Sequence, residues 1–126
     1  MKLPDYREKQ RILYITKKPA TALIAYGDLC LEANRIFDAI EFYQKAGHNP
    51  GLEKIKDFAQ QNGDMMIFQQ ATKALKQETS NSDWDEIGRQ AIQKKKYTFA
   101  RSAFEKSGNT AMLDQINEIL KSGEAQ

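Results

Sequence analysis

The chain has 126 residues, of which 40% are hydrophobic and 29% are charged, and its formal net charge is +2. This length suits one domain, and the three prolines and seven glycines argue against a loop-rich β protein. One Cys and one His exclude an internal disulfide and a Cys/His zinc site, while so small a net charge indicates no class of partner. No apolar run approaches the roughly 18 residues that cross a bilayer, and the charged N-terminus lacks a secretory pattern. We therefore expect a cytoplasmic protein.

The first predicted helix covers roughly residues 5–16 and is opened by Pro4. Its apolar residues form a weak stripe, which is typical of a helix that packs on one end of a fold. A detachable arm is the alternative, because chain ends are often loosely held. We predict that segment 1–18 is an N-terminal packing helix.

From residue 19 onward, helical patterns alternate with short stop signals. Pro19 suits the first turn of a helix, Asn34 suits a left-handed helix end, and Asn62-Gly63 followed by Asp64 is a stop followed by an N-cap. We predict a single domain, 1–126, and expect its last few residues, 122–126, to fray. Beyond the packing helix it contains hairpins 19–49, 50–80 and 81–108 and a C-terminal capping helix, 109–122.

The clearest hairpin begins at Trp84, just after Asp83, which forms a capping-box-like pattern with Glu86. Small residues stand where its two helices would touch. Gly88 lies inside the first helix, where glycine costs roughly 1 kcal/mol relative to alanine. We expect Gly88 to allow close approach of the second helix at Ala100, and we expect Trp84 to be substantially buried.

The same spacing of large and small residues occurs three times. Each set has a large and a small residue four apart and then, twelve residues later, a small and a large residue four apart. Shifting the chain by 61 residues also aligns six identical residues, among them Gly27 with Gly88. Such self-similarity predicts an all-α fold of stacked antiparallel hairpins with seven to eight helices. The three sets are Leu23-Gly27-Ala39-Tyr43, Ile55-Ala59-Ala71-Leu75 and Trp84-Gly88-Ala100-Phe104.

These motifs resemble the tetratricopeptide repeat (TPR), whose signature is a Trp, a Leu-Gly pair, a Tyr, an Ala, a Phe and an Ala. Trp84, Ile87-Gly88, Ala91, Ala100 and Phe104 fit that spacing, and two degenerate copies precede them, so the resemblance covers about residues 20–122. Repeat starts lie 32 and 29 residues apart rather than the family's 34, and the terminal Pro is missing. A looser α-solenoid is therefore the alternative to a regular TPR-like α-α superhelix.

The resemblance implies a non-catalytic protein–protein interaction module that binds a peptide or partner protein on a concave helical surface. In a stack of hairpins the first helices line that surface, and residues beside their inward stripe face the ligand. Among these, the apolar residues would form a floor or would simply pack on the neighbouring hairpin. The predicted partner-binding residues are Ile24, Asp28, Leu31, Glu32, Asp85, Arg89, Ile92 and Gln93.

No phosphate loop, nucleophile motif or spaced ligand set is present, so we predict no enzyme activity, no cofactor and no metal site. His48 is expected to be a solvated turn residue and Cys30 a small core residue. A structural or self-associating fragment that forms weak homo-oligomers is one alternative function. Weak nucleic-acid binding through Arg89, Lys94-Lys95-Lys96 and Arg101 is another, although a solvated face explains these cations better.

Overall fold

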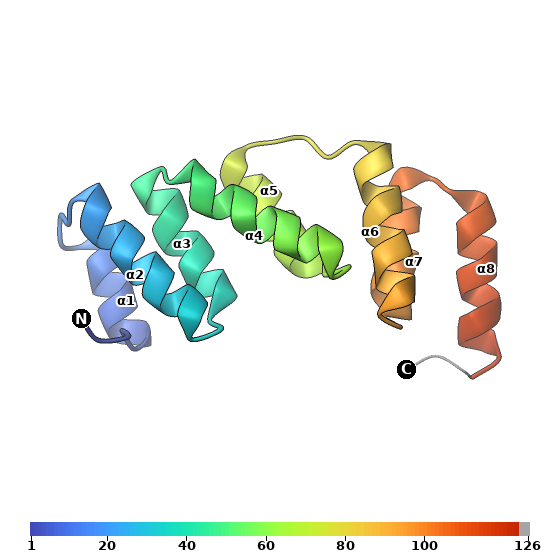
Figure 1. The fold of residues 1–126 in the computed structure, drawn as a ribbon, viewed down its shortest axis with the longest axis horizontal. Coiled ribbons are helices and arrows are strands. Elements are labelled where there is room, and N and C mark those ends of the chain that lie inside the picture. The colour runs from blue at the N-terminus through green and yellow to red at the C-terminus, as the bar shows by residue number, and fades with distance from the viewer. Residues whose placement is uncertain (124–126) are drawn as a thin grey trace.

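The computed structural model describes residues 1–123, which contain eight α-helices and no β-strand (Figure 1). The predicted all-α class with seven to eight helices is therefore confirmed. No described helix is long and apolar enough to cross a membrane. Of the residues expected to fray, 122 and 123 follow the last helix, whereas 124–126 lie outside the described part of the chain. The helices are α1 (Tyr6–Tyr14), α2 (Ala20–Glu32), α3 (Ile36–Ala46), α4 (Asn49–Gln61), α5 (Met65–Leu75), α6 (Asn81–Gln93), α7 (Tyr97–Ser107) and α8 (Thr110–Lys121).

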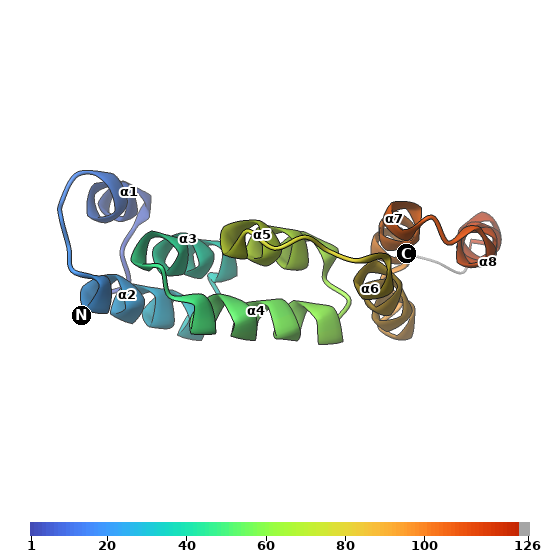
Figure 2. The ribbon, with the colours of Figure 1, turned by 90° about the horizontal axis from the view of Figure 1, so that it is seen from above.

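Six of these helices form three hairpins of the same dimensions. Helices α2, α4 and α6 each have 13 residues, and their partners α3, α5 and α7 each have 11. Figure 2 shows two layers, with the first helices on one side and the second helices, together with α1, on the other. Packing is between neighbouring elements, as expected for a repeat in which each unit contacts only the next.

Left-handed backbone conformations recur at the same place in each hairpin. An ordinary side chain is strained in this region by roughly 1–2 kcal/mol, so its use at Lys76 and Lys95 shows how strictly the hairpin geometry is kept. The expected left-handed end at Asn34 is confirmed. Between paired helices the residues are Asn34, Gly63 and Lys95, with φ of 62°, 62° and 59°, and after the second helices they are Gly47, Lys76 and Gly108, with φ of 67°, 58° and 72°.

In two hairpins an aromatic ring packs directly against a glycine. A Cβ atom added to Gly27 would lie 2.5 Å from the ring of Tyr43, and one added to Gly88 would lie 2.5 Å from the ring of Phe104. The atoms nearest to a Cβ on Gly88 belong to the ring of Phe104, one turn beyond Ala100 on α7, whereas the expected close approach of Gly88 to Ala100 stays a prediction. Physically, only a glycine leaves room for a buried ring at this distance.

The start of α6 differs from the sequence-based expectation. The helix begins at Asn81, and Ser80 is its N-cap, forming a capping box with Asp83 instead of the expected pattern with Glu86. The expected burial of Trp84 is confirmed in part, since its side chain packs against the main apolar cluster but keeps some exposed surface. Its ring packs edge-on against Phe68 at 5.6 Å, and the Lys106 ammonium lies 5.4 Å from its centroid.

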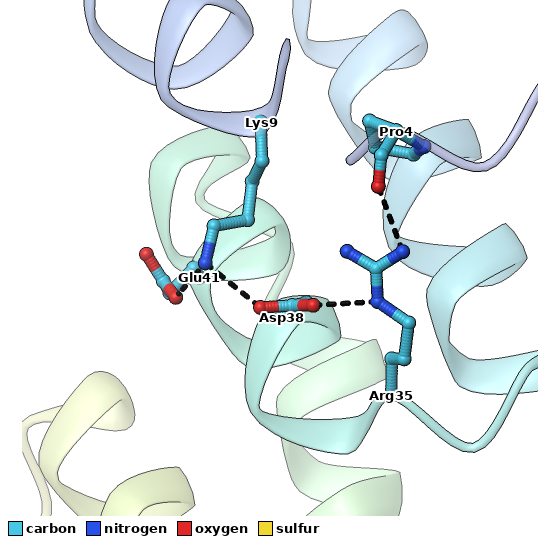
Figure 3. Close-up of polar contacts among 5 residues, drawn as sticks. All are labelled: Pro4, Lys9, Arg35, Asp38 and Glu41. Atoms are coloured by element: carbon cyan, nitrogen blue, oxygen red, sulfur yellow. Dashed lines mark hydrogen bonds and ion pairs between the residues drawn. The ribbon is translucent and has the colours of Figure 1, made fainter. Parts of the chain in front are cut away.

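Helix α1 is held to α3 by a buried cation. Lys9 is only 5% exposed, and its Nζ lies 2.8 Å from both Asp38 Oδ1 and Glu41 Oε1 (Figure 3). Arg35 donates from Nε to Asp38 Oδ2 at 2.7 Å and from Nη1 to the Pro4 carbonyl at 2.7 Å. These bonds join the segment before α2 to the second helix of the first hairpin.

The charges of this cluster reinforce one another. Burial lowers the pKa of Lys9, but its hydrogen bonds to Asp38 and Glu41 raise that pKa by more. Burial likewise raises the pKa of Asp38, but hydrogen bonds from Lys9 and Arg35 lower it by more. The buried charge is therefore compensated, and α1 sits as a packing helix with Ile12 and Leu13 in the core.

Candidate functional site: the groove between α2 and α4

Tyr43 organises the region between the first two hairpins. Its side chain is 2% exposed, and its ring lies between two glycines, because a Cβ added to Gly51 of α4 would approach it within 2.9 Å and one added to Gly27 of α2 within 2.5 Å. The hydroxyl donates a 2.5 Å hydrogen bond to Asp28 Oδ1. Burial raises the pKa of Tyr43, and the hydrogen bond to Asp28 raises it further. At neutral pH the phenol is thus a fixed donor that orients the Asp28 carboxylate.

An apolar hollow of about 240 Å³ opens between α2 and α4. Phe58 contributes one wall and is 50% exposed, whereas Ile55 beneath it is buried. Phe58 and Ile55 are three residues apart and share the apolar stripe of α4. Phe58 nevertheless lies at the exposed edge of that stripe. The lining residues are Leu31, Asn34, Ile36, Lys54, Ile55 and Phe58.

A second, more polar hollow of about 510 Å³ shares Leu31 and Lys54 with the first. Because the two hollows are adjacent at these shared residues, we refer to them together as the α2–α4 groove. His48 lines it and is half-buried, with its ring centroid 5.2 Å from that of Tyr43. His48 is therefore less solvated than expected, because Gly51 lets its ring fold back onto Tyr43. The second hollow is lined by Asp28, Leu31, Glu32, Tyr43, His48, Pro50, Gly51 and Lys54.

The charged residues of the groove are separated by the sign of their charge, with the carboxylates on α2 and the lysine on α4. Asp28 and Glu32 are exposed one helical turn apart on α2, and Lys54 is exposed on α4. Apolar surface from Leu31 and Phe58 lies next to them. This combination suits a ligand with an apolar side chain for the hollow, a cation for the α2 carboxylates and an acceptor for Lys54.

Three of the eight predicted partner-binding residues lie together in this groove, namely Asp28, Leu31 and Glu32. Ile24, the fourth residue predicted on α2, is half-buried and packs against the main core. That position agrees with the packing alternative for Ile24.

The four residues predicted on α6 lie elsewhere, since α4 separates α6 from α2 (Figure 1). Asp85 accepts a 3.3 Å hydrogen bond from Asn109, Ile92 packs against the second apolar cluster, and Gln93 is exposed. Arg89 lies 3.1 Å from Glu86 on its own helix. Arg101 of the suggested basic patch similarly has Glu105 at 4.0 Å.

The groove also contains residues that sequence reasoning missed, chiefly Lys54 and Phe58 on α4. A signal was present in the Pro50-Gly51 pair. Pro50 fits the first turn of a helix, but a glycine directly inside a helix needs a structural reason, which is the ring of Tyr43.

No protein-family model, curated protein or solved structure matches this chain, so its function is argued from this geometry.

Proposed function

We propose that the chain is a TPR-like protein–protein interaction module whose α2–α4 groove holds a segment of a partner protein. The observation that supports this is the exposed ring of Phe58 beside an apolar hollow, with the carboxylates of Asp28 and Glu32 on the facing helix. An apolar anchor surrounded by a polar rim is the usual anatomy of a protein interface.

The groove favours a particular kind of segment. Asp28 is held by Tyr43, so its carboxylate is preorganised for a basic side chain, and fixing a group in advance reduces the cost of binding. A segment with one bulky apolar residue close to a Lys or Arg would fill the apolar hollow and place its cation against the carboxylates of Asp28 and Glu32.

Affinity capture from a native extract tests the proposal, because Phe58 has a matched control. Phe37 on α3 is 49% exposed and Phe58 is 50% exposed, but Phe37 lies outside the groove. We expect Phe58→Ser to weaken binding of the captured protein by about tenfold or more, as at interface anchors, and Phe37→Ser to leave it unchanged. Equal binding by the two variants, after both are shown to fold, would remove the groove from consideration.

Self-association and nucleic-acid binding are separated by simple measurements. A self-associating fragment would increase in apparent size with concentration, and nucleic-acid binding would weaken steeply with salt. We expect neither to account for the captured partner. Cytoplasmic location and the lack of enzyme activity stay predictions.

A further inference from the structure

The α1 end of the molecule carries an excess of positive charge. Residues 1–18 contain six Lys and Arg against two Asp and Glu, whereas the rest of the chain contains thirteen against fifteen. Of these six cations, Lys9 is buried against α3, and the other five are exposed. The small net charge of the chain therefore combines a basic end with a slightly acidic remainder.

A hollow of about 400 Å³ lies at this end, where the chain passes from α1 to α2. The three charged residues that line it are all lysines, Lys17 and Lys18 from the connection and Lys45 from the end of α3. Apolar core residues form part of its lining, including Leu13 and Leu23, which are 2% and 6% exposed. We call this depression the basic hollow.

Exposed apolar side chains stand at the edge of the basic hollow. Tyr14 is 65% exposed and Ile15 is 73% exposed, and both line it. Lys45 Nζ lies 5.7 Å from the centroid of the Tyr14 ring. The surface thus places cations and uncovered apolar groups within reach of the same ligand.

We propose that the basic hollow binds an acidic segment of another protein, with an apolar side chain in the hollow and carboxylates at Lys17, Lys18 and Lys45. The charges are complementary, and complementary charge gives an interface its specificity and rate of encounter. The basic hollow shares no lining residue with the α2–α4 groove. Because the α2 wall of the groove is acidic, the two surfaces select different segments.

Two other anionic partners fit this surface less well. A helix that lies in a membrane interface needs a continuous apolar face. Helix α1 turns Ile12 and Leu13 into the core, and its exposed side mixes the rings of Tyr6 and Tyr14 with the cations of Arg7 and Arg11. Nucleic acid would meet the lysines with phosphates but would leave the apolar lining of the hollow without a contact.

A synthetic peptide with a central Leu-Phe pair between runs of Glu, labelled with a fluorophore, tests the proposal by anisotropy. We expect it to bind the full chain and to lose about tenfold or more in affinity with the double variant Lys17→Glu/Lys18→Glu. The matched control is Lys94→Glu/Lys121→Glu, which makes the same charge change at exposed positions far along the chain. We expect this control to stay within about threefold of the wild type, because exposed charges at a distance are screened.

The apolar part of the proposal is tested separately. We expect weaker binding by the variant Ile15→Ser, whose exposed position makes loss of folding no explanation, and by a peptide with Ser-Ser in place of Leu-Phe. Three results would overturn the proposal: undiminished binding of the Ser-Ser peptide, an equal loss with the control variant, or no binding of the Leu-Phe peptide. Oligothymidine or phosphatidylserine vesicles that bind through Lys17 and Lys18 where the peptide fails would replace the partner with a nucleic acid or a membrane.

Discussion

The α2–α4 groove and the junction of α6 with α8 occupy equivalent places, 61 residues apart, but they differ at the first turn of the next helix. Gly51 in α4 leaves the Tyr43 ring beside an open hollow. The equivalent residue in α8 is Met112, which is half-buried and packs against the cluster around Phe104. The repeat thus keeps the same hairpin interior, whereas the first turn of the next helix places a glycine beside Tyr43 but a methionine in the cluster with Phe104.

The ring at the centre of each junction differs as well. Tyr43 bonds to Asp28, whereas Phe104 has no hydroxyl and Arg89, at the place of Asp28, pairs with Glu86 on its own helix. The first junction therefore presents an oriented carboxylate to the solvent, and the third presents a neutralised ion pair.

One contact is common to the first and third hairpins. Arg35 and Lys96 stand at equivalent positions just before the second helix, and each donates to a backbone carbonyl of the preceding unit, Pro4 or Asn62. The segment before α1 therefore supplies the acceptor for the first hairpin, and the turn between α4 and α5 supplies the acceptor for the third.

The largest expected effect comes from adding a side chain at Gly27 or Gly88, where an aromatic ring packs against the glycine. Gly27→Val and Gly88→Val should each lower the free energy of unfolding by about 3 kcal/mol, because the new side chain would overlap a fully packed ring. Asn117→Val, at an exposed site inside α8, should change it by less than about 0.5 kcal/mol. Urea denaturation measures all three. If either glycine variant were as stable as the Asn117 control, the close packing of a ring on the glycine would contribute nothing to stability.

The second hairpin supplies a rescue for this test. It has Ala59 where the others have glycine and Leu75 where they have a ring, and Ala59 is fully buried. The pair Gly88→Ala with Phe104→Leu should therefore be less destabilised than the sum of the two single changes, by about 1 kcal/mol. Additive effects would argue against the size compensation.

The charged cluster under α1 should give the next largest effect. Asp38→Ala leaves buried Lys9 with Glu41 alone and should destabilise the chain by about 2 kcal/mol, whereas Lys9→Met should be nearly neutral, since an apolar replacement removes the desolvation cost. The third hairpin has Phe99 at the place of Asp38, so this dependence belongs to the first hairpin only.

The pH dependence of this cluster follows from the two pKa shifts. The pKa of Asp38 is lowered by folding, so its stabilisation is complete above the unfolded value near 3.8 and is lost as the pH falls through the folded pKa. The pKa of Lys9 is raised, so its contribution is complete below 10.5 and is lost as the pH rises through the folded pKa. The difference between wild type and Asp38→Ala should therefore be smaller at pH 3 than at pH 7, and an unchanged difference would contradict the assignment.

A smaller effect is expected when the first junction is made like the third. Tyr43→Phe removes the hydrogen bond to Asp28 and should cost about 1 kcal/mol. Tyr6→Phe, at a residue that is 73% exposed, is the control and should cost nothing measurable. Because folding raises the pKa of Tyr43, the difference should persist at neutral pH and diminish above about pH 10. Equal denaturation midpoints for the two variants would show that the bond contributes nothing.

The smallest effect is expected at the left-handed turn residues. Lys95→Gly should stabilise the chain by about 0.5–1 kcal/mol, because glycine adopts a φ of 59° without strain. Asn34→Gly should be close to neutral, since asparagine tolerates this conformation. Thermal denaturation of both variants measures the difference, and a destabilised Lys95→Gly would mean that its side chain makes a contact worth more than the strain.

Spacing in the sequence was enough to predict the hairpins, because large and small residues at fixed separation define which helix faces meet. It predicted the left-handed Asn34, since few residues tolerate that conformation. It did not identify the partner of Gly88, because periodicity places a residue on a face but does not say which side chain covers it.

The candidate site was predicted only on its α2 side. Phe58 fits the apolar stripe of α4, and its exposure depends on the neighbouring hairpin, which is joined by the five-residue link 76–80 instead of the two-residue link 47–48. The α6 residues were predicted from their place beside the inward stripe of a first helix. The packing next to that helix also involves Met112, which lies outside the hairpin that carries these residues.

A partner is expected to bind in the α2–α4 groove and not at the equivalent place on α6 and α8. A photo-crosslinking amino acid placed at position 58 or at position 119, which are 61 residues apart, compares the two directly in native extract. We predict a crosslinked partner from position 58 that Glu32→Lys diminishes, and none from position 119. Equal crosslinking from both positions, or crosslinking from position 119 alone, would contradict the account.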